Sequence, residues 1–168
     1  MSSPLDPAPG VLAEEPVPRA IPVSAGALIF DGAGRLLIVD PSYKKGWTIP
    51  GGVMEPTGET PWQACQREVF EECGLTVTRG RLAAVDTRPA KPNRPLQLRL
   101  LFDCGVLDDA TLAGITLCEE EILGHRFATP AEAAVLLRPA VARRVTSALA
   151  SPTCCYLENG LPVAAVTG

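Results

Sequence analysis

The chain has 168 residues, a length that suits one globular domain, and 46% of them are apolar, as a packed core requires. Its formal net charge of −4 argues against a nucleic-acid polymer as the main partner. The six cysteines include no Cys-x-x-Cys pair and there is a single histidine, so a zinc site has little support and a disulfide framework is not expected.

The N-terminal stretch differs in composition from the rest of the chain. Residues 1–20 hold five of the seventeen prolines among small residues, which predicts a disordered tail followed by a folded domain over residues 21–168. No basic segment precedes an apolar core there, and no run of about 18 apolar residues occurs anywhere. We therefore expect a cytoplasmic protein with no membrane partner.

The domain is expected to open with strands. An apolar run over 22–30 and a second over 35–39 flank the turn residues 31–34, which predicts a β-hairpin. The segment 47–52 reads as a short strand that ends in a glycine turn.

The clearest helix prediction covers residues 60–73. Thr60 is suited to cap the helix, Pro61 to occupy its first turn, and Gly74 to end it in a left-handed conformation. At 100° per residue, an apolar stripe forms from Trp62, Val69 and Cys73.

Strands and helices alternate through the remainder of the chain. Strands are expected over 76–87 and 96–107, helices over 129–137 and 140–150, and an edge strand over 156–163. A basic, proline-rich loop joins the first two strands, and an acidic triplet occupies 119–121. The interleaving indicates a mixed α/β or α+β sandwich.

Three carboxylates share one face of the predicted helix, because Glu68, Glu71 and Glu72 are spaced by three and four residues. Like charges this close cost stability unless a cation lies among them, and Mg²⁺ prefers such oxygen ligands. Arg67 lies four residues before Glu71, within reach of an ion pair. The spacing therefore predicts a metal site, although three glutamates on an arbitrary helix are usually a solvated face.

The same residues resemble the signature of the Nudix hydrolases, a family that hydrolyses nucleoside diphosphates linked to another moiety. From Glu59 onward the pattern is complete: seven residues lead to Arg67, followed by Glu68, Val69, Glu71, Glu72, Gly74 and Leu75. One departure is that six residues rather than five separate Gly52 from Glu59, since Pro56-Thr57 stands where the family usually has one residue. We expect the extra residue to bulge a surface loop. The resemblance implies an α/β/α sandwich with a mixed β-sheet.

The resemblance also implies roles for individual residues. Mg²⁺, or Mn²⁺ in its place, would be bound by Glu68, Glu72 and Glu71 with the carbonyl of Gly52. Arg67 would orient the carboxylates, and Glu59 would support either the loop or a water next to the metal ligands. The expected catalytic residues are Glu68, Arg67 and Glu71. The catalytic base would be Glu68, or else one of Glu119, Glu120 and Glu121, which are equally consistent with a surface acidic turn.

Further candidates lie outside the signature. Lys44 and Lys45 could contact substrate phosphates, although solvated lysines at a hairpin end are common. Trp47 could stack on a base or belong to the core, and Glu120 could face the substrate. Arg88, Lys91 and Arg94 either line a substrate loop or are solvated.

These patterns lead to one main hypothesis and one alternative. The first is a Mg²⁺-dependent pyrophosphohydrolase acting on a small nucleotide substrate: an ADP-ribose-like compound, a dinucleotide or an oxidised dNTP. The alternative is a Nudix-like domain that binds a nucleotide without turning it over. The edge strand or the proline-rich tail could support a homodimer.

Overall fold

The computed structural model describes residues 20–56 and 58–166, so the predicted tail, apart from Ala20, and the inserted Thr57 lie outside the described residues. The strands are β1 (Val23–Phe30), β2 (Leu36–Pro41), β3 (Gly51–Val53), β4 (Arg81–Arg88), β5 (Gln97–Val106), β6 (Ile122–Ala128), β7 (Cys155–Glu158) and β8 (Leu161–Pro162). The helices are α1 (Pro61–Cys73), α2 (Asp109–Leu112), α3 (Pro130–Leu136) and α4 (Pro139–Ala150).

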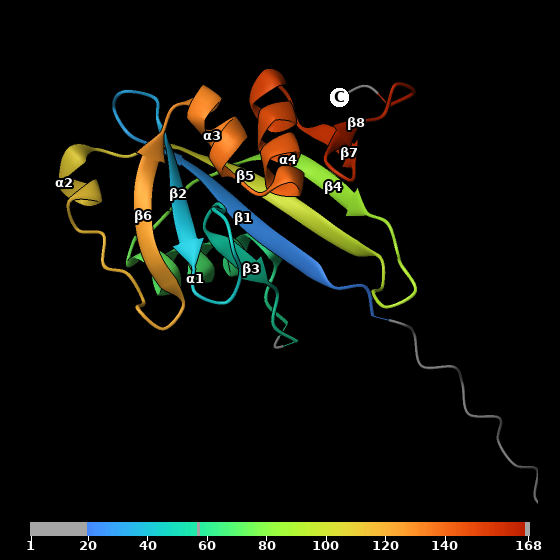
Figure 1. The fold of residues 1–168 in the computed structure, drawn as a ribbon, viewed down its shortest axis with the longest axis horizontal. Coiled ribbons are helices and arrows are strands. Elements are labelled where there is room, and N and C mark those ends of the chain that lie inside the picture. Colours follow the sequence, from blue (N-terminus) through green and yellow to red (C-terminus); the bar gives the residue numbers. More distant parts are fainter. Residues whose placement is uncertain (1–19, 57, 167–168) are drawn as a thin grey trace, which may run out of the picture.

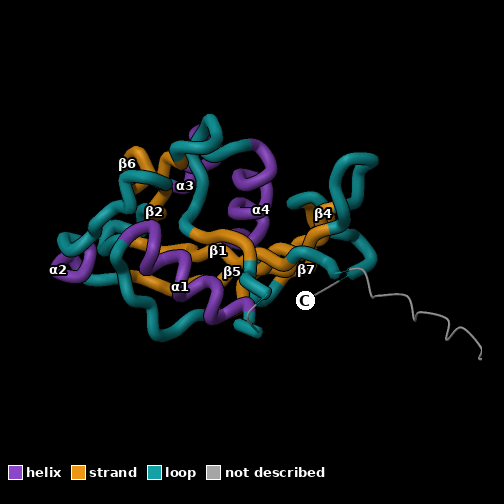
Figure 2. Tube along the Cα trace, turned by 90° about the horizontal axis from the view of Figure 1, so that it is seen from below, coloured by secondary structure: helices purple, strands orange, loops and turns teal. Residues whose placement is uncertain are grey.

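The strands form one mixed sheet. Its order is β6-β2-β1-β5-β4-β7-β8, and β3 pairs with the start of β1 beside the β2 hairpin strand. The pairs β1·β5 and β4·β7 are parallel, and the other pairs are antiparallel. Helices cover both faces of this sheet: α1 packs on one face, and α3 and α4 pack on the other (Figures 1 and 2). The predicted α/β/α sandwich with a mixed sheet is confirmed.

The apolar runs of the central strands serve both faces. Leu28, Leu36 and Ile38 pack toward α3 and α4, whereas their neighbours Ile29 and Leu37 pack toward α1. Side chains alternate across a strand, so a strand buried on both faces has to be apolar at every position. This explains why β1 and β2 read as continuous apolar segments in the sequence.

Helix α1 begins and ends as predicted. The Thr60 hydroxyl accepts a hydrogen bond from the Gln63 N–H at 3.3 Å, and the Gln63 side chain accepts one from the Thr60 N–H at 2.8 Å. Gly74 takes the left-handed conformation, with φ 68°, and its N–H donates to the Phe70 carbonyl at 2.8 Å. These caps fix the register of the helix, and therefore which of its glutamates face the sheet.

Two predicted strands are shifted in the structure. The strand expected from residue 76 begins at Arg81, although Leu75 and Val77 are buried beneath α1. The Val77 carbonyl accepts from the Gln66 side chain at 2.7 Å, so it bonds to the helix instead of to a neighbouring strand. The strand expected over 47–52 is reduced to isolated bridges at Trp47 and Thr48, and β3 follows at Gly51–Val53.

Two other segments differ from the prediction. Helix α2 was not expected; the Asp108 side chain caps it by accepting from the Thr111 N–H at 2.8 Å. The single edge strand expected over 156–163 is instead the hairpin β7–β8, because Asn159 and Gly160 both have positive φ and form a tight turn. Within the described ranges, no helix is both long and apolar enough to cross a bilayer.

Candidate active site

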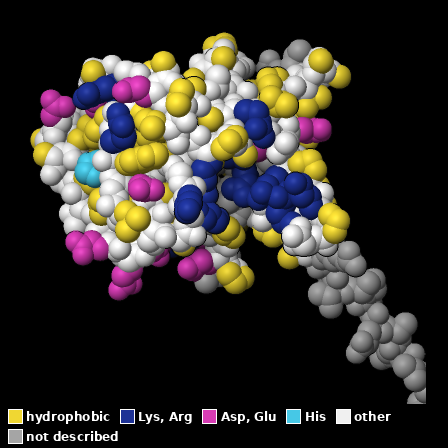
Figure 3. Space-filling model, viewed as in Figure 1, with side chains coloured by type: hydrophobic (Ala, Val, Ile, Leu, Met, Phe, Trp, Pro, Cys, Tyr) yellow, Lys and Arg dark blue, Asp and Glu magenta, His cyan; other side chains and the backbone are white. Residues whose placement is uncertain are grey.

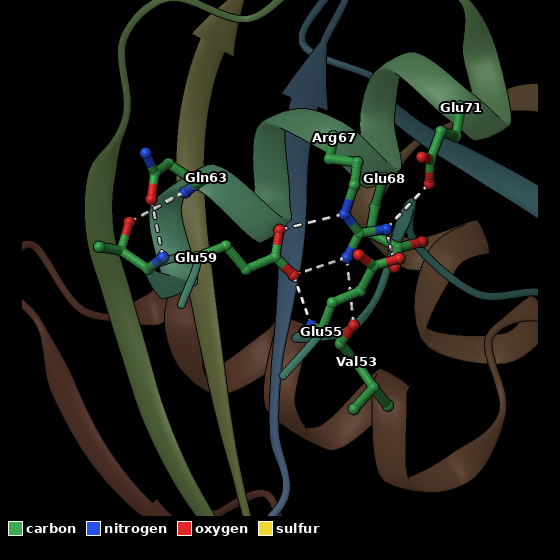
Figure 4. Close-up of polar contacts among 8 residues, drawn as sticks. Val53, Glu55, Glu59, Gln63, Arg67, Glu68 and Glu71 are labelled. Carbon is green, nitrogen blue, oxygen red and sulfur yellow. Dashed lines mark hydrogen bonds and ion pairs between the residues drawn. The ribbon is translucent and has the colours of Figure 1, made fainter. Parts of the chain in front are cut away.

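Arg67 joins helix α1 to the loop that precedes it (Figure 4). Its Nη2 lies 2.8 Å from Glu59 Oε1 and donates to the Val53 carbonyl at 3.2 Å. Its Nη1 lies 2.9 Å from both Glu68 Oε1 and Glu71 Oε2. The guanidinium group lowers the pKa of Glu59, and these carboxylates in turn raise the pKa of Arg67. Arg67 therefore stays charged and holds both the loop and the helix carboxylates in place.

Glu68 and Glu72 converge on the diglycine turn at Gly51 and Gly52. The Gly51 N–H donates to Glu72 Oε2 at 2.8 Å. The carboxylate of Glu68 lies so close to Gly52 that a β-carbon at that position would collide with it. Gly51 itself has a φ of 139° and approaches the backbone of β1 too closely for any side chain. The two glycines thus allow β3 to lie directly beside the two carboxylates.

The surroundings of these two carboxylates favour their neutral forms unless a cation is bound. Glu72 is only 2% exposed. Burial raises its pKa to about 8, and the negative charges of Glu68 and Glu121 add to this effect, while the Gly51 hydrogen bond opposes it. Burial likewise raises the pKa of Glu68, against the opposing influence of Arg67. A positive charge between Glu68 and Glu72 would stabilise both in their ionised forms.

The donor atoms at this turn suit a hard divalent cation. Carboxylate and carbonyl oxygens are the ligands that Mg²⁺ prefers, and Glu68, Glu72 and Gly52 supply them side by side. Glu71 is turned outward, with its side chain 50% exposed and paired with Arg67. In the described part of the chain, no three His, Cys, Asp or Glu side chains form a cluster that could hold a metal by themselves. The residues therefore fit a cation held by two carboxylates with backbone and solvent oxygens.

A cavity of about 240 Å³ opens beside Gly51 and Gly52. The starts of β1 and β5, strand β3, the end of β4 and the inner side of α4 surround it. Lys44 lines this cavity, whereas Lys45 lines a separate hollow around residues 40–46.

Trp47 and Glu120 lie away from this cavity. Trp47 packs against the core between the sheet and α4. Glu120 is exposed, and its carbonyl accepts from the Ser42 hydroxyl at 2.7 Å. Of the three residues 119–121, Glu121 is the one whose negative charge raises the pKa values of Glu68 and Glu72. Glu121 is therefore the one that acts electrostatically on the site.

Sequence reasoning missed three arginines that line the cavity, namely Arg99 on β5 and Arg138 and Arg144 at and within α4. Arg99 could have been suspected, because it is the one charged residue in the leucine-rich segment 96–101. The two arginines near α4 carry no local signal, since an exposed helix face would contain similar residues.

Comparison with known proteins agrees with this geometry. The sequence pattern described as the NUDIX domain matches residues 20–149. Human diphosphoinositol polyphosphate phosphohydrolase 3-alpha is 36% identical over 74 residues, a stretch that covers 44% of this chain and 44% of that relative. The chain therefore matches less than half the length of this curated relative.

Solved structures share the fold. A MutT protein from Methanosarcina mazei has a TM-score of 0.61 at 23% identity, covering 75% of this chain and 90% of that one. An Ap4A hydrolase from C. elegans has a TM-score of 0.60 at 22% identity, covering 77% and 93%. Identities this low show the fold alone, but the family pattern spans most of the chain. The chain belongs to the NUDIX domain family, as its carboxylate signature predicted.

Proposed function

We propose that the protein is a divalent-metal-dependent hydrolase that cleaves a phosphoanhydride bond in a nucleoside diphosphate derivative. One observation carries this proposal: the buried carboxylate of Glu72 lies beside that of Glu68 at a glycine turn that borders a cationic cavity. A buried carboxylate with acidic neighbours is stable in its charged form only when a cation compensates it.

The residues divide the work of hydrolysis between them. Glu68, Glu72 and the Gly52 carbonyl would hold Mg²⁺, with Mn²⁺ as a substitute. The bound metal would lower the pKa of an attacking water and neutralise charge on the phosphate oxygens. Arg67 would act as a positioning residue, because its hydrogen bonds to Glu68, to Glu71 and to the loop before α1 keep Glu68 in place.

The choice of general base rests on position. Glu68 is the first candidate, because it lies at the turn and burial raises its pKa toward the range useful for proton transfer. Glu121, which directly precedes β6, is the second candidate, because its negative charge raises the pKa values of Glu68 and Glu72.

The related proteins act on diverse diphosphates. Their names include diphosphoinositol polyphosphate phosphohydrolases, an Ap4A hydrolase and a UDP-X diphosphatase. All of these names point to a phosphoanhydride bond, which is the kind of bond that we propose for this chain.

The experiment is a screen of nucleotide substrates, including ADP-ribose, Ap4A and oxidised dNTPs, with Mg²⁺ or Mn²⁺ and product identification by mass. Solvent enriched in ¹⁸O identifies the phosphorus atom that is attacked. Glu72→Gln keeps the side-chain volume and removes one charge, so turnover should fall by at least about 100-fold without loss of folding.

A matched control is Glu158→Gln, which removes the same charge from an exposed residue of β7 and should keep full activity. If substrates bind but none is cleaved with either metal, the chain is a nucleotide-binding domain without turnover, and the proposal is wrong. Full activity of Glu72→Gln would remove that residue from the metal site.

A further inference from the structure

Five cationic side chains meet in the cavity beside the diglycine turn. We call the set Lys44, Arg88, Arg99, Arg138 and Arg144 the cationic pocket. All five line both the cavity of about 240 Å³ and an adjoining hollow of about 270 Å³ beneath α4. In the space-filling view, lysine and arginine side chains gather around a hollow beside α4 and continue toward the β4–β5 loop (Figure 3). The rest of that face mixes both signs of charge.

The positive charge of the pocket is poorly compensated. Among the described residues that line the two hollows, none is acidic. The carboxylate that pairs with a pocket cation is Asp86, and its two oxygens are already used by Arg144 Nε at 2.7 Å and by the Gly160 N–H at 2.8 Å. Among the described residues, Arg144 is therefore the one pocket cation with a salt bridge, in a protein whose overall charge is −4.

Two of the arginines have buried donors without a partner. The Nε atoms of Arg99 and Arg138 are buried and make no hydrogen bond within the described structure. Arg99 otherwise reaches only neutral acceptors, the Ser24 hydroxyl at 3.4 Å and the Gln97 side chain at 3.1 Å. Buried donors are normally satisfied, so these groups indicate that a ligand supplies the acceptors.

The cations also disfavour one another. Burial and the neighbouring arginines lower the pKa of Arg99 to about 10, and the same two causes lower the pKa values of Lys44 and Arg88. Charges of one sign that are held together in a partly buried site are unfavourable until an anion lies among them. Phosphate groups fit best, because guanidinium groups bind them through paired hydrogen bonds.

The amount of charge exceeds what the reacting diphosphate requires. A diphosphate substituted at both ends carries about two negative charges, fewer than the five positive charges of the pocket, even if the metal held by Glu68 and Glu72 neutralises none of them. A nucleobase would call for aromatic surfaces to stack on, yet Tyr43 is the one aromatic residue among the described residues lining the cavity. Two more cations, Lys91 and Arg94, line a third hollow that Arg88 shares.

We propose that the substrate carries a cluster of further phosphate groups on the side of its diphosphate that faces α4, and that Arg99 and Arg138 recognise this cluster. The inference rests on the proposed function for the position of the scissile bond. The phosphates could be arranged as a linear chain or around a compact ring, and both present the same clustered anionic oxygens.

The experiment measures binding to the metal-free protein in EDTA, so that it does not depend on turnover. The probes are inorganic tripolyphosphate for the chain, myo-inositol hexakisphosphate for the ring, and ADP-ribose as a diphosphate without further phosphates. Titration calorimetry should show at least one of the two polyphosphates binding 10-fold or more tightly than ADP-ribose. Raising the salt concentration should weaken the polyphosphate more than ADP-ribose.

The variants Arg99→Gln and Arg138→Gln test the recognition directly. Each should weaken the tighter polyphosphate about 10-fold, because each removes a charged donor from the pocket. Arg126→Gln is the matched control: it removes the same charge from β6 at the far end of the sheet, and it should bind as the unmodified protein does. Thermal melting of all three variants separates lost recognition from lost folding.

The possible results separate the two proposals. Equal affinities for ADP-ribose and both polyphosphates, or folded Arg99→Gln and Arg138→Gln variants that bind like Arg126→Gln, would overturn the inference even if the protein hydrolyses ADP-ribose. Tight, arginine-dependent polyphosphate binding without turnover of any diphosphate would support the inference and reject the hydrolase. The tighter of the two polyphosphates identifies the arrangement of the phosphates.

Discussion

Binding of the proposed metal ion should release a proton from Glu72. In the metal-free protein, burial and the neighbouring carboxylates raise the pKa of Glu72 from 4.5 to about 8. A carboxylate has to lose its proton before it can bind a metal. Below pH 8, therefore, binding of Mg²⁺ and loss of this proton are the same event, and the apparent affinity rises with pH.

The size of the effect follows from that pKa. About nine-tenths of Glu72 is protonated at pH 7, half at pH 8 and one-tenth at pH 9, so Mg²⁺ should release about 0.9, 0.5 and 0.1 protons per site. The stability that protonated Glu72 contributes is fully present below pH 4.5 and is lost as the pH rises through about 8. That contribution to the free energy of unfolding is on the order of 5 kcal/mol. A bound metal would instead stabilise the ionised carboxylate.

The assay is titration calorimetry in buffers of different ionisation enthalpy, since the slope of the observed heat against that enthalpy counts released protons. Thermal melting with and without Mg²⁺ should show a metal-induced shift that grows between pH 6 and 9. Glu72→Gln should lose both the proton release and most of the pH dependence. Binding at pH 7 without proton release in the unmodified protein would refute the reasoning.

Two substitutions test contacts that the structure makes specific. Gly52→Ala places a methyl group against the carboxylate of Glu68, which is the flexible end of a side chain; turnover should fall at least about 10-fold while the melting temperature stays within a few degrees, whereas Gly32→Ala, which meets open space, should change neither. Asp86→Asn leaves Arg144 buried beside a neutral partner and should lower the free energy of unfolding in urea by about 3 kcal/mol; an unchanged unfolding midpoint would contradict a structural role for this pair.

The carboxylate helix could be predicted because its signals are local. Thr60, Pro61 and Gly74 define the two ends, and the spacing of the glutamates defines a face. The spacing does not predict how deeply each glutamate is buried. Glu72 is buried and Glu71 is exposed, although they are adjacent in the chain. That difference arises where β3 approaches the helix, which no local pattern encodes.

The cationic pocket could not be predicted for a related reason. Arg88 and Arg99 come from neighbouring strands, while Arg138 comes from the start of a helix that crosses the opposite face from α1. In the sequence, Arg88 and Arg138 cannot be told from ordinary surface arginines. Their meeting depends on the order of the sheet, which places β4 and β5 beneath α4, and strand order depends on long-range pairing that a single strand's residues do not specify.

The small β7–β8 hairpin follows the residues that match the family pattern, and its Gly160 N–H binds the same carboxylate that holds Arg144. Asp86 on β4 therefore anchors two later segments: helix α4, which covers the cationic pocket, and the β7–β8 hairpin, which packs against α4. A protein shortened after residue 150 would retain every carboxylate of the signature. Asp86 would nonetheless lose its hydrogen bond from the Gly160 N–H, and α4 would be held less firmly. Ligand binding at the cationic pocket would therefore weaken before metal binding did.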